Sequence, residues 1–184
     1  KVDLKRFFDG TDPSLVIRDL AEIGNIDYRD AVYIYPEGIL PSINLNEIQD
    51  YSSVFKNYFQ SNHKIIVGIT RYKETEIFNS MALLDNDLKL ISVYDKNKLV
   101  PFGEYLPFEN FLKNYGFKKI TQGYQSFSSA SERDLIKMND TKFLPLICYE
   151  IIYSGGLYKY SDNYDFIINI SEDGWFGKSI GPKQ

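Results

Sequence analysis

The 184-residue sequence predicts an α/β fold, organised as one domain over residues 1–184. Short apolar runs rich in β-branched and aromatic residues stop at proline or at polar turn residues, which is typical of buried strands. Other segments repeat apolar residues at intervals of three and four, which indicates amphipathic helices. Hydrophobic residues make up 43% of the chain, enough to bury one sizeable core.

Two helices are expected in the N-terminal third. Asp12 is a suitable N-cap, and Pro13 occupies the first helical position of a segment whose apolar periodicity continues to Ile23. Asn44 is expected to cap the second helix, which extends to Phe59. The apolar face of that helix consists of Ile48, Tyr51, Phe55 and Phe59.

The remaining patterned segments predict strands. Pro36 ends the first by removing a backbone donor, the polar turn at 85–87 joins two others, and Asn139-Asp140 lies at the tip of a hairpin. Residues 97–129 are expected to be mostly loop. The predicted strands cover residues 31–35, 65–70, 77–84, 88–94, 134–138, 141–147 and 165–170.

Three chemically useful side chains follow predicted strands. Glu37 follows the first strand, Lys96 follows the fourth, and Cys148 follows the sixth. Groups at the C-terminal ends of parallel strands can converge even when they are far apart in sequence. Cys148 is the only cysteine, so it can form no disulfide within the chain and is either an inert small hydrophobe or a nucleophile.

The chemistry of these groups favours the nucleophile. An ammonium such as that of Lys96 favours the thiolate over the thiol, and Glu37 can serve as general base. The Lys96 ammonium and the backbone N–H of Tyr149 can stabilise a tetrahedral oxyanion. The single histidine, His63, lies in a polar stretch and is expected at the surface, so a Cys–His pair is disfavoured.

Four sequence blocks carry a family resemblance: 35–41, 94–107, 147–151 and 169–184. They resemble the nitrilase superfamily with its Glu-Lys-Cys triad, and most closely its apolipoprotein N-acyltransferase branch. The resemblance implies a nitrilase-type α-β-β-α sandwich, here lacking its first strand and C-terminal elements. The chain departs from the family at 172–174, where Glu-Asp-Gly replaces the usual Asn-Asp-Ala.

The resemblance also implies supporting roles around the triad. Glu104 would hold Lys96 and Glu37, although it could also be a solvated loop residue. Glu150 would cap or order the turn that carries Cys148. Tyr149 and Trp175 would line the acyl pocket, although both could be ordinary core aromatics. No metal or organic cofactor is implied.

The activity implied is transfer of an acyl chain from a phospholipid to the N-terminal amine of S-diacylglyceryl-cysteine in a prolipoprotein. The family places this domain on the periplasmic face of the inner membrane, between membrane helices. The chain itself contains no apolar run near the roughly 18 residues that a spanning helix needs, so it is expected to be a fragment. Its net charge of −4 and lack of a basic tract argue against nucleic acid as a partner.

Aromatic and aliphatic residues are unusually dense between residues 99 and 127. Such a loop could pack on its own core, or it could be a lid that meets the bilayer and admits acyl chains; the lid is the favoured interpretation. Two other functions stay open. A soluble amidase would use the same triad with water as acceptor, and a non-catalytic scaffold would tolerate loss of the triad.

Overall fold

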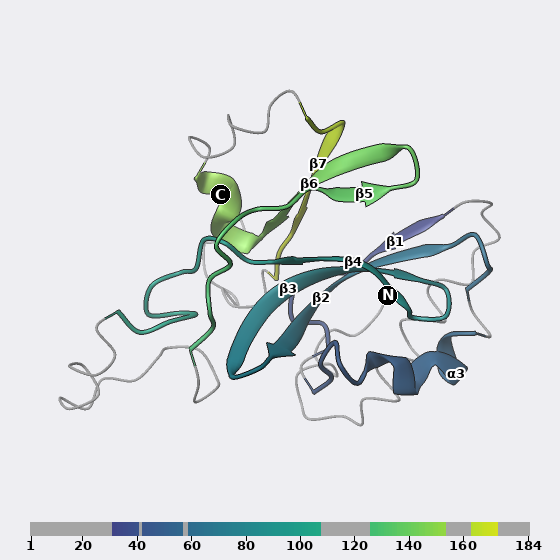
Figure 1. The fold of residues 1–184 in the computed structure, drawn as a ribbon, viewed down its shortest axis with the longest axis horizontal. Helices are drawn as coiled ribbons and strands as arrows, with labels where there is room; N and C mark the ends of the chain where they lie inside the picture. The colour runs from purple at the N-terminus through teal and green to yellow at the C-terminus, as the bar shows by residue number, and fades with distance from the viewer. Residues whose placement is uncertain (1–30, 41, 57–58, 108–125, 154–162, 173–184) are drawn as a thin grey trace, which may run out of the picture.

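The computed structural model describes residues 31–40, 42–56, 59–107, 126–153 and 163–172. These residues form two β-sheets with short helical segments (Figure 1). The predicted helix over residues 12–23 lies outside the described residues. The strands are β1 (Val32–Ile34), β2 (Lys64–Lys73), β3 (Glu76–Asp85), β4 (Leu90–Asp95), β5 (Ile136–Met138), β6 (Thr141–Ile147) and β7 (Phe166–Ile170). The helical segments are η1 (Ile48–Tyr51), α3 (Ser52–Phe55) and η2 (Cys148–Ile152), of which η1 and η2 are 3₁₀ helices.

The larger sheet has the strand order β1-β2-β3-β4. β1 pairs parallel with β2, whereas β2, β3 and β4 form an antiparallel meander. β4 therefore runs in the same direction as β1, and both end on the same side of the sheet. In the smaller sheet, β5 and β6 form the predicted hairpin, and β6 pairs parallel with β7.

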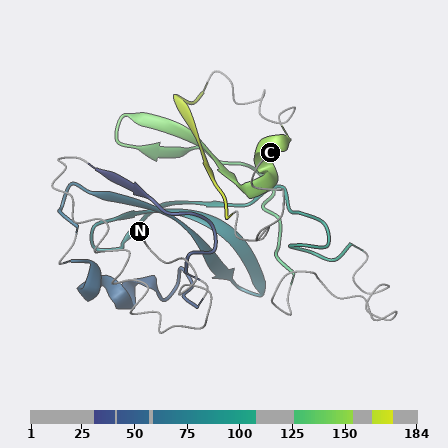
Figure 2. The same ribbon diagram turned by 180° about the vertical axis from the view of Figure 1, so that it is seen from behind.

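The larger sheet is buried on both faces because its central strands are apolar almost throughout. On one face, Ile65, Val67 and Ile69 of β2 pack against the segment that carries η1 and α3. On the opposite face, Ile66 joins Met81, Tyr94 and residues of the smaller sheet in a second core cluster. Figures 1 and 2 both show the smaller sheet and α3 on opposite sides of the larger sheet. The expected layering of helix, sheet and sheet is therefore present.

Several predicted boundaries differ from the structure, and hydrogen bonds explain two of them. The second helix begins at Ile48 instead of directly after Asn44, because the Asn44 side chain accepts a hydrogen bond from the Asn46 N–H at 3.0 Å in a turn, and Asn44 bridges to Thr70 of β2. β4 begins at Leu90 instead of Leu88, because the Asp85 carboxylate accepts the Lys89 N–H at 2.8 Å and closes a longer turn.

The described helices are short. None of those in the described ranges has the length and apolar character needed to cross a membrane.

Candidate active site

Glu37, Lys96 and Cys148 converge between the two sheets. The Lys96 ammonium lies 3.9 Å from Oε1 of Glu37, and the charges of both residues act on the Cys148 thiol. Glu37 and Lys96 follow β1 and β4, which end on the same side of one sheet. Cys148 follows β6 and therefore comes from the other sheet. The sequence argument placed all three groups on one sheet, whereas face-to-face packing of two sheets is what brings the thiol to the other two.

Gly68 of β2 allows Glu37 to reach this position. Residues 36 and 37 cross the inner face of β2 so closely that a Cβ on Gly68 would lie 2.6 Å from Cα of Glu37 and 3.0 Å from the Pro36 carbonyl oxygen. Because Gly68 has no side chain, the chain can pass over β2 and place the Glu37 carboxylate beside β3. There Asn79 donates a hydrogen bond to Oε1 of Glu37 at 2.6 Å.

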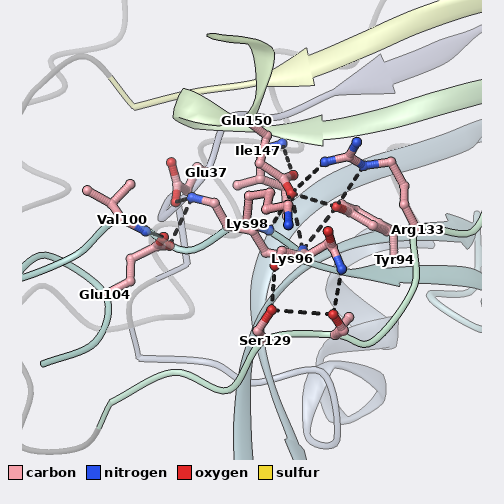
Figure 3. Close-up of polar contacts among 12 residues, drawn as sticks. Glu37, Tyr94, Lys96, Lys98, Val100, Glu104, Ser129, Arg133, Ile147 and Glu150 are labelled. Carbon is pink, nitrogen blue, oxygen red and sulfur yellow. Dashed lines mark hydrogen bonds and ion pairs between the residues drawn. The ribbon is translucent and has the colours of Figure 1, made fainter. Parts of the chain in front are cut away.

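A hydrogen-bonded group of four side chains fixes the charged part of the site. Asn79 also donates to Oε1 of Glu104 at 2.7 Å, and the Lys96 ammonium donates to the same oxygen at 2.9 Å. The second oxygen of Glu104 accepts the Val100 N–H at 2.9 Å, as Figure 3 shows. Glu104 is 8% exposed and Lys96 is 1% exposed, so the solvated-loop alternative for Glu104 is wrong. Glu104 contacts Lys96 directly and is linked to Glu37 through Asn79 and Lys96.

One oxygen of the Glu37 carboxylate is available to accept a proton. Oε2 of Glu37 is buried and accepts no hydrogen bond of ordinary length from the described residues. The Cys148 thiol is close enough to this carboxylate for each group to act on the pKa of the other. Asn79 therefore holds one oxygen while the other remains able to accept the thiol proton.

Cys148 lies at a sharp turn between β6 and η2. Its backbone has a φ of +56°, a conformation that costs a non-glycine residue about 1–3 kcal/mol and is commonly found at active sites. The thiol interacts with the backbone N–H of Tyr149 and with the Ser171 side chain. The Tyr149 N–H is thus beside the sulfur, where an oxyanion formed by attack of the thiol would need a donor.

Glu150 caps the turn that carries Cys148. It is fully buried, and its Oε2 accepts the Ile147 N–H at 3.0 Å. Its Oε1 accepts hydrogen bonds from the Tyr94 hydroxyl at 2.7 Å and the Lys98 N–H at 2.9 Å, and it pairs with the Arg133 guanidinium at 2.9 Å (Figure 3). The residue therefore connects the turn at Cys148 to the chain that follows Lys96.

Burial shifts the pKa values of the two groups that would exchange a proton. Burial raises the pKa of the Glu37 carboxyl, although the Lys96 charge and the hydrogen bond from Asn79 oppose the shift. Burial also raises the pKa of the Cys148 thiol, and the Glu37 charge adds to this effect, whereas Ser171 and Lys96 oppose it. Lys96 acts on the thiol in the predicted direction, but burial outweighs it. A base must therefore remove the thiol proton when the sulfur attacks.

The other predicted site residues fall in different surroundings. The Tyr149 side chain is 40% exposed, so it is not a core aromatic, and Trp175 lies outside the described residues. In the aromatic loop, Phe102 is 45% exposed and Leu106 is 5% exposed, so the described part both packs down and presents an aromatic ring outward. Residues 108–125 of this loop lie outside the described ranges.

His63 is not at the surface as predicted. It is 1% exposed, its Nδ1 accepts the Gln60 N–H at 3.1 Å, and its ring packs 5.2 Å from the Tyr33 ring. The polar residues around His63 suggested a solvated ring. In the structure, a hydrogen bond within the turn and contacts with aromatic rings replace the solvent.

Sequence reasoning missed Asn79 and Arg133, which bind the predicted site residues. Neither residue directly follows a strand. Asn79 and Ser80 interrupt the apolar residues of β3, and that break in the pattern was the available signal. Arg133 lies in an irregular segment before β5 with no pattern around it, so no local signal identifies it.

Comparison with known proteins agrees with this geometry. Residues 35–184 match the carbon-nitrogen hydrolase family model. Among curated proteins, the chain is 34% identical over 163 residues to the apolipoprotein N-acyltransferase of Rhizobium rhizogenes, and 33% identical over 168 residues to that of Caulobacter vibrioides. These alignments cover 85% and 83% of this chain. The chain spans about 30% of the length of these relatives.

Solved structures share the fold at low sequence identity. A carbon-nitrogen hydrolase from Helicobacter pylori G27 has a TM-score of 0.61 at 13% identity, covering 94% of this chain and 59% of that protein. An amidase from Nesterenkonia sp. AN1 has a TM-score of 0.57 at 10% identity, covering 92% of this chain and 67% of that protein. The two stacked sheets, with their strand-end groups between them, agree with this nitrilase-type fold. The chain belongs to the carbon-nitrogen hydrolase family.

Proposed function

We propose that this chain is the catalytic part of an apolipoprotein N-acyltransferase. Such an enzyme transfers an acyl chain from a membrane phospholipid to the N-terminal amine of S-diacylglyceryl-cysteine in a prolipoprotein. The observation that carries the proposal is similarity to curated proteins of that name over some 85% of this chain, with Glu37, Lys96 and Cys148 brought together in one site. By the same argument, the site would face the periplasm at the inner membrane.

In the first step, Sγ of Cys148 attacks the ester carbonyl of the phospholipid while Oε2 of Glu37 takes the thiol proton. The unpartnered, buried state of that oxygen supports this assignment. The Lys96 ammonium and the Tyr149 N–H stabilise the oxyanion. When the intermediate collapses, the carbon–oxygen bond breaks, the leaving alkoxide takes the proton from Glu37, and lysophospholipid departs from a Cys148 thioester.

In the second step, the amine of diacylglyceryl-cysteine attacks the thioester. Glu37 now accepts a proton from the attacking nitrogen, the carbon–sulfur bond breaks, and the sulfur of Cys148 recovers the proton. The raised pKa of Glu37 suits both transfers, because a carboxylate with a pKa nearer neutrality is a stronger base. Two steps through one covalent intermediate predict ping-pong kinetics.

The direct test follows the acyl chain in the full-length protein. Incubation with phospholipid should add the mass of one acyl group to Cys148 as a hydroxylamine-sensitive thioester. Addition of a diacylglyceryl-cysteine peptide should remove that mass and acylate the peptide amine. Cys148→Ala is the control and should form no adduct. Rapid hydrolysis of small amides without any adduct from phospholipid would refute the acyltransferase and support the amidase alternative.

A further inference from the structure

Arg133 is a buried cation that does not contact the three reacting groups through any described hydrogen bond or ion pair. It lies just before β5 and is 7% exposed. Its Nη2 donates to Oε1 of Glu150 at 2.9 Å, and its Nε donates to the Tyr94 hydroxyl at 3.1 Å. The guanidinium carbon also lies 5.9 Å from the centre of the Tyr94 ring. Arg133 thus acts on the site only through Glu150 and Tyr94.

Glu150 is the junction between the two sheets at this position. Its Oε1 binds the N–H groups of Asn97 and Lys98, at 3.1 and 2.9 Å, immediately after Lys96. Its Oε2 binds the N–H of Ile147, immediately before Cys148. One carboxylate therefore holds the backbone that follows Lys96 and the backbone that precedes Cys148 (Figure 3).

This junction requires an ionised carboxylate. Both oxygens of Glu150 accept hydrogen bonds from backbone N–H groups, and protonation would turn one of them into a donor. A buried carboxylate without a cation is expensive and tends to become neutral. Arg133 supplies the only ion pair that Glu150 makes among the described residues. Its guanidinium therefore compensates the buried negative charge of the carboxylate that holds both segments.

We propose that Arg133 is a positioning residue: by neutralising Glu150 it sets the separation between the Lys96 ammonium and the Cys148 turn, and so aligns the two oxyanion donors. The inference rests on the proposed role of Cys148 as nucleophile. Glu37 is placed independently, by Asn79 and by its passage over Gly68. Loss of Arg133 should thus disturb the oxyanion donors more than the base.

Two reactions of the same thiol separate these effects. Alkylation by iodoacetamide needs the thiol and its base but forms no oxyanion. Acylation by p-nitrophenyl butyrate passes through a tetrahedral oxyanion and does not require phospholipid. In Arg133→Met, acylation should fall by about 100-fold, the typical cost of a displacement near 1 Å in a catalytic site, while alkylation should change by less than about threefold. If Arg133 only stabilised the fold, its loss would slow acylation and alkylation equally, and the ratio of the two rates would not change.

A second change tests the charge argument. Glu150→Gln combined with Arg133→Met removes both charges, so no lone buried ion remains. The double variant should acylate no slower than Arg133→Met alone, because Arg133 acts through the Glu150 carboxylate and the amide, like a protonated carboxyl, already faces one backbone N–H with a donor. Arg133→Lys keeps the charge but cannot hydrogen-bond to Glu150 and Tyr94 at the same time. Its ratio of acylation to alkylation should therefore lie between those of the wild type and Arg133→Met. This variant replaces Arg133→Met in the test if Arg133→Met does not fold. Arg71→Met is the matched control, because Arg71 pairs with Asp95 at 2.6 Å within one sheet, and it should keep the wild-type ratio.

The outcomes distinguish this inference from the proposed function. Equal losses of alkylation and acylation in Arg133→Met, or an equal change of ratio in Arg71→Met, would overturn the positioning role. If wild-type Cys148 reacts with p-nitrophenyl butyrate but not with phospholipid, the proposed function fails while the Arg133 test stays valid. If wild-type Cys148 is not acylated by either ester, the nucleophile assignment fails and the positioning role fails with it.

Discussion

Gly68→Ala should displace the catalytic base while leaving the fold intact. An added Cβ would lie 2.6 Å from Cα of Glu37, and ordinary contact begins at about 3.4 Å, so the two must separate by about 0.8 Å. The obstructing atoms include the backbone at residues 36 and 37, which cannot turn aside like a side chain. The movement would lengthen the bond from Asn79 to Glu37, now 2.6 Å. A misplacement near 1 Å typically reduces a catalytic step by about 100-fold.

Gly68→Ala should affect the free energy of unfolding too little to unfold the protein. Overpacking of this kind costs about 1–3 kcal/mol, and domains commonly have about 5–15 kcal/mol of unfolding free energy, so the variant should remain folded. The assay is the rate of Cys148 alkylation by iodoacetamide, which needs the base, alongside thermal unfolding. Gly103→Ala is the control, because its Cβ would meet Val100 at 3.4 Å, an ordinary contact. Wild-type alkylation in a folded Gly68→Ala variant would refute the close-approach argument.

Three further predictions concern the reacting groups themselves. Cys148→Ser should form no detectable acyl-enzyme by mass spectrometry, because a hydroxyl is far less acidic than a thiol; an ester adduct at the normal rate would contradict the nucleophile assignment. Lys96→Ala should slow single-turnover acylation by about 100-fold or more as one oxyanion donor is lost, and unchanged acylation would remove that role. Glu37→Gln should abolish acylation yet raise the free energy of unfolding at neutral pH. Because burial raises the folded pKa of Glu37, wild-type stability falls as pH rises from the unfolded pKa through the folded one. The advantage of Glu37→Gln in urea titrations should therefore appear over that interval and vanish in acid, and an advantage independent of pH would contradict it.

Much of the fold could be predicted because most strands have a clear local signal. Apolar runs ended by turn residues identified each of the seven strands in the described part of the chain, and Asn139-Asp140 marked the hairpin between β5 and β6. The errors arose where distant contacts prevail over local pattern. The segment at Asn44 is held by β2, so the helix begins later than its periodicity suggests.

The site was predictable at the strand ends and not elsewhere. Glu37, Lys96 and Cys148 stand out because polar groups directly follow apolar strands. The groups that orient them are harder to find. Asn79 acts from within a strand and Gly68 acts by lacking a side chain. Both depend on the path of residues 36 and 37 over β2, which no local sequence pattern shows.

On the proposed mechanism, the charges of the site explain how an acyl donor promotes attack by the thiol. Lys96 is close to two carboxylates, at 2.9 Å from Glu104 and 3.9 Å from Glu37, so its charge is shared and cannot alone ionise the Cys148 thiol, whose pKa burial raises. The resting enzyme thus holds a protonated, weakly nucleophilic sulfur beside a base. Proton transfer to Glu37 becomes favourable when a carbonyl carbon is present to receive the sulfur and the developing oxyanion engages Lys96. Such coupling would limit reaction of the thiol with other electrophiles while no substrate is bound.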